Sequence, residues 1–181
     1  MNSETVLDVL LKKRIIYLSE RVSEKEAQRI SEAIVVLNAQ SDAPITLYIN
    51  SGGGSIDAGL AIYDIVRHSA APVVGIVQQK AHSAASVVLQ GCRVRKALKH
   101  AQIIVHNGSV SMDKKFDDIH VDIEKEIRAT IEDSIKKRAF MYAIYAERTG
   151  KPVEEIKQIC LKDKSVYADE AKQLGLIDEV I

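Results

Sequence analysis

Several residues that can carry acyl-transfer chemistry lie at the ends of apolar segments. Ser83 follows an apolar segment that begins at Pro72, and it heads the run of small residues Ala84-Ala85-Ser86. A serine at the start of a helix has free backbone amides beside it, which favour negative charge and suit a nucleophile. The amide of Ala84 would then be a natural donor to an oxyanion. The same position is typical of a plain helix N-cap, so the serine alone does not decide between the two.

A base and an acid for such a serine are harder to assign. His106 ends an apolar strand predicted over 103–105, where side chains of α/β proteins reach the functional crevice. A half-buried structural histidine is the alternative. His82 is adjacent to Ser83, so its side chain diverges from the serine, and we interpret it as a packing or pocket-wall residue. Asp163 lies on a predicted loop, as an orienting acid often does, but spacing alone does not connect it to the other residues.

Three consecutive glycines, Gly52 to Gly54, follow the apolar segment 45–49 and precede a predicted helix. The lysine of a phosphate-binding P-loop is missing, and the dinucleotide-binding glycine spacing is not met. Two interpretations remain, a nest of backbone donors suited to an oxyanion and a plain tight turn.

Composition limits the class of protein. The 181 residues predict one domain, 1–181, and the 25 basic and 25 acidic residues cancel, which argues against a nucleic-acid or membrane face. The start of the chain lacks the charge order of a signal peptide, so we expect a cytoplasmic protein. Cys92 and Cys160 have no metal-ligand spacing around them and are predicted to be buried free thiols. We expect no metal and no organic cofactor.

Apolar periodicity predicts alternating strands and helices, and therefore parallel crossover units of the α/β class. A long helix without Gly or Pro is predicted over about 117–149, with isoleucines every four residues from Ile119 to Ile135. That stripe winds around the helix, so it suits contacts with other subunits or with the chain's own core. The predicted strands cover 15–18, 45–49, 72–77 and 103–105, and the other predicted helices cover 23–39, 55–69, 83–91, 153–160 and 168–174.

Several of these segments, in this order, resemble the Clp protease proteolytic subunit family across nearly the whole chain. The motifs are LYINSGGGSIDAGLAIYD, the gap-free spacing from Tyr63 to Ser83, IIVHN, and YADEAKQLGLID. Counting back from the last motif puts Asp163 at the place of the family's catalytic acid.

The resemblance implies a fold of stacked right-handed ββα crossover units, shared with crotonases, and a protruding handle helix at about 117–149. It implies a serine endopeptidase with the triad Ser83, His106 and Asp163, and oxyanion amides at Gly54 and Ala84. Gly53 would lie in the segment that pairs with an extended peptide. Expected partners are unfolded or small protein substrates, further copies of the chain in heptameric rings that can stack, and an AAA+ unfoldase ATPase.

The sequence also departs from the family pattern. Gly52 replaces the usual proline, and Ala84-Ala85 replaces the usual Met-Gly, a form similar to the phage and prophage branch, whose members can act in capsid maturation. Leu161-Lys162 stands where an acid–arginine pair usually joins subunits across the ring interface. Two alternatives therefore stay open: a non-catalytic ring subunit that partners an active paralogue, and a crotonase-like enzyme of acyl-CoA thioesters.

Overall fold

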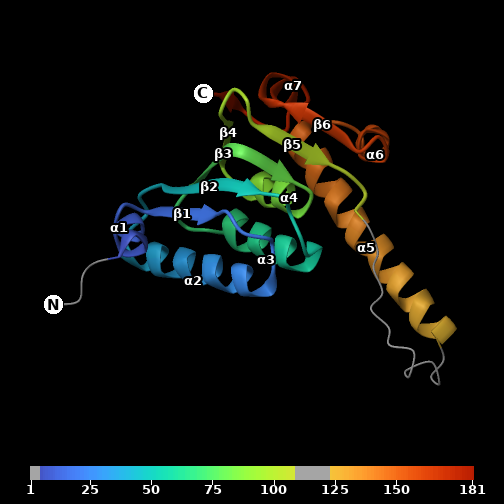
Figure 1. Cartoon of the computed structure of the whole chain (residues 1–181), viewed down its shortest axis with the longest axis horizontal. Helices are drawn as coiled ribbons and strands as arrows, with labels where there is room; N and C mark the ends of the chain where they lie inside the picture. Colours follow the sequence, from blue (N-terminus) through green and yellow to red (C-terminus); the bar gives the residue numbers. More distant parts are fainter. Residues whose placement is uncertain (1–4, 109–122) are drawn as a thin grey trace.

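The computed structural model describes residues 5–108 and 123–181, and its centre is a seven-stranded, mostly parallel sheet (Figure 1). The strands are β1 (Ile15–Leu18), β2 (Ile45–Ser51), β3 (Val73–His82), β4 (Val94–Ala97), β5 (Gln102–Val105), β6 (Lys164–Tyr167) and β7 (Glu179–Val180). The helices are α1 (Val6–Lys12), α2 (Glu24–Gln40), α3 (Ile56–Arg67), α4 (Ala84–Gly91), α5 (Ile123–Thr149), α6 (Val153–Leu161) and α7 (Ala168–Gln173).

The sheet branches at β3. One edge of this long strand pairs in parallel with β2, and the other edge pairs first with β4, over Val74–Val77, and then with β5, over Lys80–His82. From there one arm continues from β4 to β7, and the other from β5 to the antiparallel strand β6. The ends of β3 and β5 therefore lie side by side, at the carboxyl edge where sites of parallel sheets form.

Local signals explain the helices that cover the sheet. The Ser23 side chain accepts a hydrogen bond from the Glu26 amide at the start of α2, and Ser55 does the same for the Ala58 amide at the start of α3. In α2 the residues Ile30, Ile34 and Leu37 are fully buried while Val35 and Val36 are exposed, whereas α4 is buried along all of its eight residues. A helix that is buried all round needs small and apolar residues on every side, which the sequence AASVVLQG supplies.

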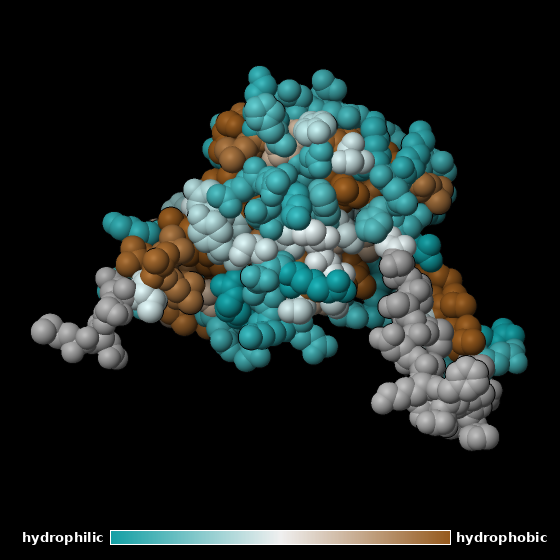
Figure 2. All heavy atoms as spheres, in the orientation of Figure 1, coloured by the Kyte–Doolittle hydropathy of each residue, from teal (hydrophilic) through white to brown (hydrophobic). Residues whose placement is uncertain are grey.

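The predicted handle helix is α5, which extends away from the sheet (Figure 1). Its C-terminal part packs on the core through Met141, Tyr142 and Tyr145. Its projecting part leaves isoleucines of the predicted stripe open, with Ile131 48% and Ile135 54% exposed. Figure 2 shows apolar surface along this helix and at the opposite end of the molecule, over α1. The predicted start of the helix, 117–122, lies outside the described residues.

The structure corrects several element predictions. The strand predicted to end at Val77 continues to His82, because the polar residues Gln78 to Lys80 stay extended beside β2 and β5. The sequence analysis also missed α1, β4, β6 and β7. These are short elements, and their charged residues interrupt the apolar alternation from which strands were predicted. The prediction of buried free cysteines is confirmed, and no helix within 5–108 and 123–181 is long and apolar enough to cross a membrane.

A buried arginine fastens the C-terminus to the sheet. Arg95 of β4 is 4% exposed, and its guanidinium donates to the Asp178 carboxylate at 2.5 Å, to Gln90 Oε1 at 2.7 Å and to the Gly175 carbonyl at 2.8 Å. Burial by itself raises the pKa of Asp178, but the hydrogen bonds from Arg95 outweigh burial, so the pKa lies below its ordinary value.

We expect Asp178→Asn to lower the free energy of unfolding by about 2 kcal/mol, because it removes the charged partner of a buried guanidinium. The lowered pKa means that this stabilisation is present above about pH 4 and is lost as the pH falls through the folded-state pKa. Urea unfolding from pH 3 to pH 7 should therefore show a smaller pH dependence in the variant.

The matched control is Glu179→Gln, which removes the more exposed carboxylate that pairs with Lys96 at 2.6 Å. That change should cost less than about 1 kcal/mol. Equal losses in the two variants would contradict the role assigned to Arg95.

Candidate active site

Ser83 lies at a strained turn between β3 and α4. Its φ of 53° and ψ of −125° fall in a region that residues with a side chain rarely adopt. The Ser83 amide donates to the Ile104 carbonyl at 3.0 Å, and its own carbonyl accepts from the Ser86 amide and from the Ser86 hydroxyl at 2.7 Å. The Ser83 side chain makes no capping hydrogen bond to α4, so its hydroxyl is left for other partners. This succession of a strand, a strained serine and a helix resembles the backbone arrangement of a nucleophile elbow.

Strand register brings His106 and Asp163 together. The β5–β6 ladder is antiparallel and pairs Val105 with Lys164, so the next step along both strands sets His106 opposite Asp163. The His106 Nδ1 atom lies 3.5 Å from the Asp163 Oδ1 atom. The parallel β3–β5 ladder pairs His82 with Ile104, so Ser83 and His106 leave neighbouring strands at the same edge.

The contact between His106 and Asp163 is longer than a strong hydrogen bond, which needs about 2.7–3.2 Å. Catalytic contacts in free enzymes are often loose and shorten when substrate binds. The Asp163 side chain is 74% exposed, and its backbone φ of 45° is in the left-handed region that aspartate tolerates better than most residues.

The glycine turn packs directly against the serine turn. A Cβ atom on Gly53 would lie 2.5 Å from the His82 carbonyl oxygen and 2.8 Å from the Ser83 Cβ, so only glycine fits there. A Cβ atom on Gly54 would lie 2.2 Å from the Val22 carbonyl oxygen. Within the described residues, the amides of Gly54 and Ala84 donate no hydrogen bond, and both belong to these two touching turns. Two such free donors are what an oxyanion requires.

His82 is a partly buried, uncharged side chain, which agrees with its interpretation as a packing or pocket-wall residue. Its Nε2 atom is buried and has no hydrogen-bond partner among the described residues. Burial lowers the pKa of His82, and the charges of Lys80 and His106 lower it further. The residue is therefore neutral near pH 7.

Helix α5 reaches the Ser83 turn through Ser86, a contact that the sequence analysis missed. The Tyr145 hydroxyl lies 2.5 Å from the Ser86 hydroxyl, which in turn bonds to the Ser83 carbonyl. Burial raises the pKa of Tyr145, so its hydroxyl keeps its proton. The polar residue Ser86, about one helical turn after Ser83, was the only sign of this contact in the sequence. Its partner, Tyr145, lies 59 residues later, so the sequence could not identify it.

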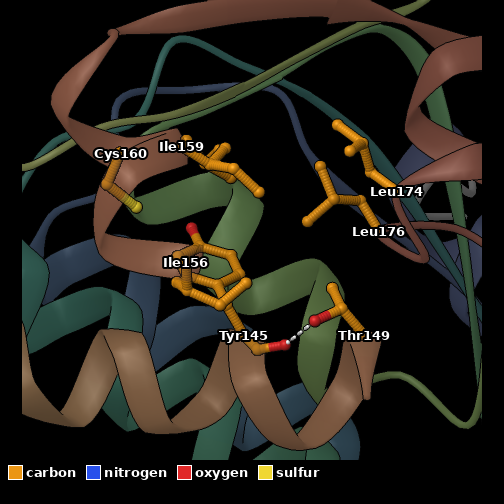
Figure 3. Close-up of a pocket in the computed structure, with 8 residues that line it drawn as sticks. Tyr145, Thr149, Ile156, Ile159, Cys160, Leu174 and Leu176 are labelled. Atoms are coloured by element: carbon orange, nitrogen blue, oxygen red, sulfur yellow. Dashed lines mark hydrogen bonds between the residues drawn. The ribbon is translucent and has the colours of Figure 1, made fainter. Parts of the chain in front are cut away.

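Tyr145 also borders a small apolar cavity, about 10 Å³ in volume, enclosed by α5, α6 and the segment after α7 (Figure 3). Burial, with a contribution from the charge of Asp163, raises the pKa of the Cys160 thiol beside this cavity to about 11. The thiol is therefore protonated at neutral pH and is no nucleophile. Residues 5–108 and 123–181 contain no cluster of three or more His, Cys, Asp or Glu that could hold a metal ion.

Comparison with known families gives a match to the sequence model of the Clp protease family over residues 1–181. The chain belongs to the Clp protease family. A solved structure of a mutant ClpP1 from Listeria monocytogenes is similar to it with a TM-score of 0.85 and 23% sequence identity. The similarity covers 98% of this chain and 96% of that chain, and at this identity it shows the fold.

Membership in the Clp protease family confirms the resemblance predicted from the motifs, and the structural match confirms the predicted α/β fold class with its handle helix. The catalytic roles of Ser83, His106, Asp163, Gly53, Gly54 and Ala84 stay predictions. In this Clp protease family member the structure places all six at one edge of the sheet, at the ends of β2, β3 and β5 and before β6.

The contact between the glycine and serine turns gives a matched pair of variants. We expect Gly53→Ala to reduce kcat/KM on a short peptide by at least about 100-fold, because the new Cβ must displace the backbone that carries the oxyanion donors. Gly52→Ala should retain activity within about twofold, since a Cβ on Gly52 would meet nothing within 4 Å. Steady-state kinetics of both variants, with circular dichroism to verify folding, would test this. Equal activity in the two variants would contradict the assigned geometry.

Proposed function

We propose that this chain is a serine endopeptidase that hydrolyses peptide bonds in unfolded or small protein substrates inside an oligomeric chamber. The observation that carries the proposal is the shared register of β3, β5 and β6, which sets Ser83, His106 and Asp163 at one edge with the His106–Asp163 contact at 3.5 Å. The membership in the Clp protease family supports the same chemistry.

In the proposed mechanism His106 accepts the Ser83 hydroxyl proton while the serine oxygen attacks the substrate carbonyl carbon. Asp163 faces Nδ1 of His106, so Nδ1 carries a proton toward the carboxylate and Nε2 is the basic nitrogen. The imidazolium then gives its proton to the leaving amine, and the acyl-enzyme forms. Water repeats the sequence in reverse, with His106 as base and then as acid, and frees Ser83.

The oxyanion of both tetrahedral intermediates would lie between the Gly54 and Ala84 amides. Each amide belongs to one of two turns that touch through Gly53, so the donors are fixed relative to each other before substrate arrives. Fixed donors in a site that excludes water are commonly the largest contribution to acyl-transfer catalysis, worth about 3 kcal/mol each.

The proposed assembly is a heptameric ring, which can stack on a second ring and receive substrates from an AAA+ unfoldase. The exposed isoleucines of α5 support contacts between subunits, because an isolated subunit leaves them in water. Leu161, 61% exposed on α6, replaces an acid used across the family's ring interface, so we expect the ring-to-ring contact to be weak.

A fluorophosphonate probe tests the proposed nucleophile. We expect one label per subunit by intact mass, mapped to Ser83, because such probes trap only a serine activated by a base. Ser83→Ala should take no label and should lose at least about 1,000-fold in peptide hydrolysis with its assembly unchanged. Labelling that persists in Ser83→Ala would point to another nucleophile, and a folded but unlabelled parent would favour the non-catalytic ring subunit.

Analytical ultracentrifugation over a concentration series tests the assembly. We expect single rings, or double rings that separate on dilution or in moderate salt, with specific peptidase activity falling in parallel. Each exposed contact contributes only about 0–1 kcal/mol, but a ring repeats it in every subunit. A double ring that stays intact at nanomolar subunit concentration, with constant specific activity, would contradict the expectation.

A further inference from the structure

A polar groove opens next to the glycine turn. Its volume is about 410 Å³, and it is lined by residues from the ends of β1, β2 and β3, namely Ser19, Glu20, Arg21, Asn50, Gly52, Gly53, Gln79 and Lys80. Gly53 is shared between this groove and the contact with the Ser83 turn. A peptide that places its scissile bond at Ser83 can therefore lay a neighbouring residue in the groove.

The groove carries more positive than negative charge, although the whole chain is neutral. Lys80 and Arg21 form no ion pair or hydrogen bond with any part of the chain that the structure describes. The one acid in the lining, Glu20, acts on Arg29 of α2, whose pKa its charge helps to raise after the larger effect of Glu26. Two cations, Lys80 and Arg21, therefore line the groove with one carboxylate, that of Glu20.

The alternation of side chains along β3 brings the positive charge of Lys80 toward the candidate site. Lys80 and His82 alternate with the buried Ala81, so both side chains lie on the same face of β3. The charge of Lys80 contributes to lowering the pKa of His82, which is adjacent to Ser83. A negative group in the groove would therefore lie within electrostatic reach of the reacting bond.

Asn50 gives the same groove a buried hydrogen-bond acceptor. Its Oδ1 atom is buried in the lining and has no hydrogen-bond partner among the described residues. A buried acceptor without a donor is unfavourable, so such an atom suits a donor that arrives with a ligand. The backbone N–H of an extended peptide is such a donor.

We propose that this groove is a subsite for an acidic side chain of the peptide substrate, whose carboxylate is bound by Lys80 and Arg21 while a backbone N–H of the same peptide donates to Asn50. This inference rests on the proposed peptidase function and names the substrate class that the site selects.

The test uses pairs of fluorogenic peptides, blocked at both ends, that differ only by Glu or Gln at one position around the scissile bond. At low salt the parent should favour Glu at one position by about fivefold in kcat/KM, which corresponds to an exposed or half-exposed ion pair. Lys80→Gln should bring this Glu-to-Gln ratio close to one, and Lys80→Glu should instead favour Lys over Gln at that position. Because the readout is a ratio within one variant, a change in folding or in total activity does not alter it.

Lys99→Gln is the control for charge, because Lys99 is exposed in the turn before β5, outside the groove lining. It should keep the parental Glu-to-Gln ratio. Equal cleavage of the Glu and Gln peptides at every position would overturn the proposal, and so would a preference that survives Lys80→Gln combined with Arg21→Gln. One further peptide, with Gln at that position and a free C-terminal carboxylate, separates acidic side chains from chain ends. Faster cleavage of this peptide alone would assign the groove to chain ends and overturn the side-chain subsite.

A binding measurement separates failure of the groove from failure of the peptidase. Fluorescence anisotropy of labelled Glu and Gln peptides on Ser83→Ala needs no turnover, and we expect the Glu peptide to bind about fivefold more tightly. If the Glu peptide binds more tightly but the parent cleaves neither peptide, the proposed function is wrong and the subsite is supported. If the parent cleaves both peptides at equal rates and Ser83→Ala binds them with equal affinities, the proposed function is supported and the subsite is wrong.

Discussion

The site depends on the way β3 changes partners along its length. Its first half pairs with β4 and its second half pairs with β5, so the strand that leads to Ser83 and the strand that leads to His106 end together. The antiparallel strand β6 then carries Asp163 back to the same edge. A slip of one residue in either ladder would turn the buried residues Ile103 and Val105 toward solvent. Core packing therefore fixes the same register that sets the site.

A strained serine persists only where its surroundings hold it. The unusual Ser83 backbone costs on the order of 1–3 kcal/mol, and three contacts oppose its relaxation. The Ile104 carbonyl holds its amide, Ser86 holds its carbonyl, and Gly53 packs against its Cβ. Tyr145 of α5 reaches the same turn through Ser86, so the handle helix takes part in holding Ser83.

The sequence predicted those parts of the fold whose signals are local. The helices predicted to begin at Ser23 and Ser55 do begin there, with each serine as the N-cap. The glycine and serine turns likewise lie where apolar segments end. Asp163 could be reached only through the family resemblance, because β6 buries Val166 alone and gives no alternating pattern. The sequence also could not show which glycines are obligatory. Gly52 has open space where a side chain would start, whereas Gly53 touches a strand that lies about 30 positions later.

The proposed acid is carried by the least protected strand of the site. Among the described residues β6 pairs only with β5, and three of its four residues are exposed. Edge segments with few buried contacts open at a lower free energy than central strands do. Fraying of β6 would remove Asp163 from His106 while β3, α4 and the serine turn stay folded. The proposed triad would then lose its acid while the rest of the chain stays folded, so anything that covers β6 would favour the complete triad by suppressing this local opening.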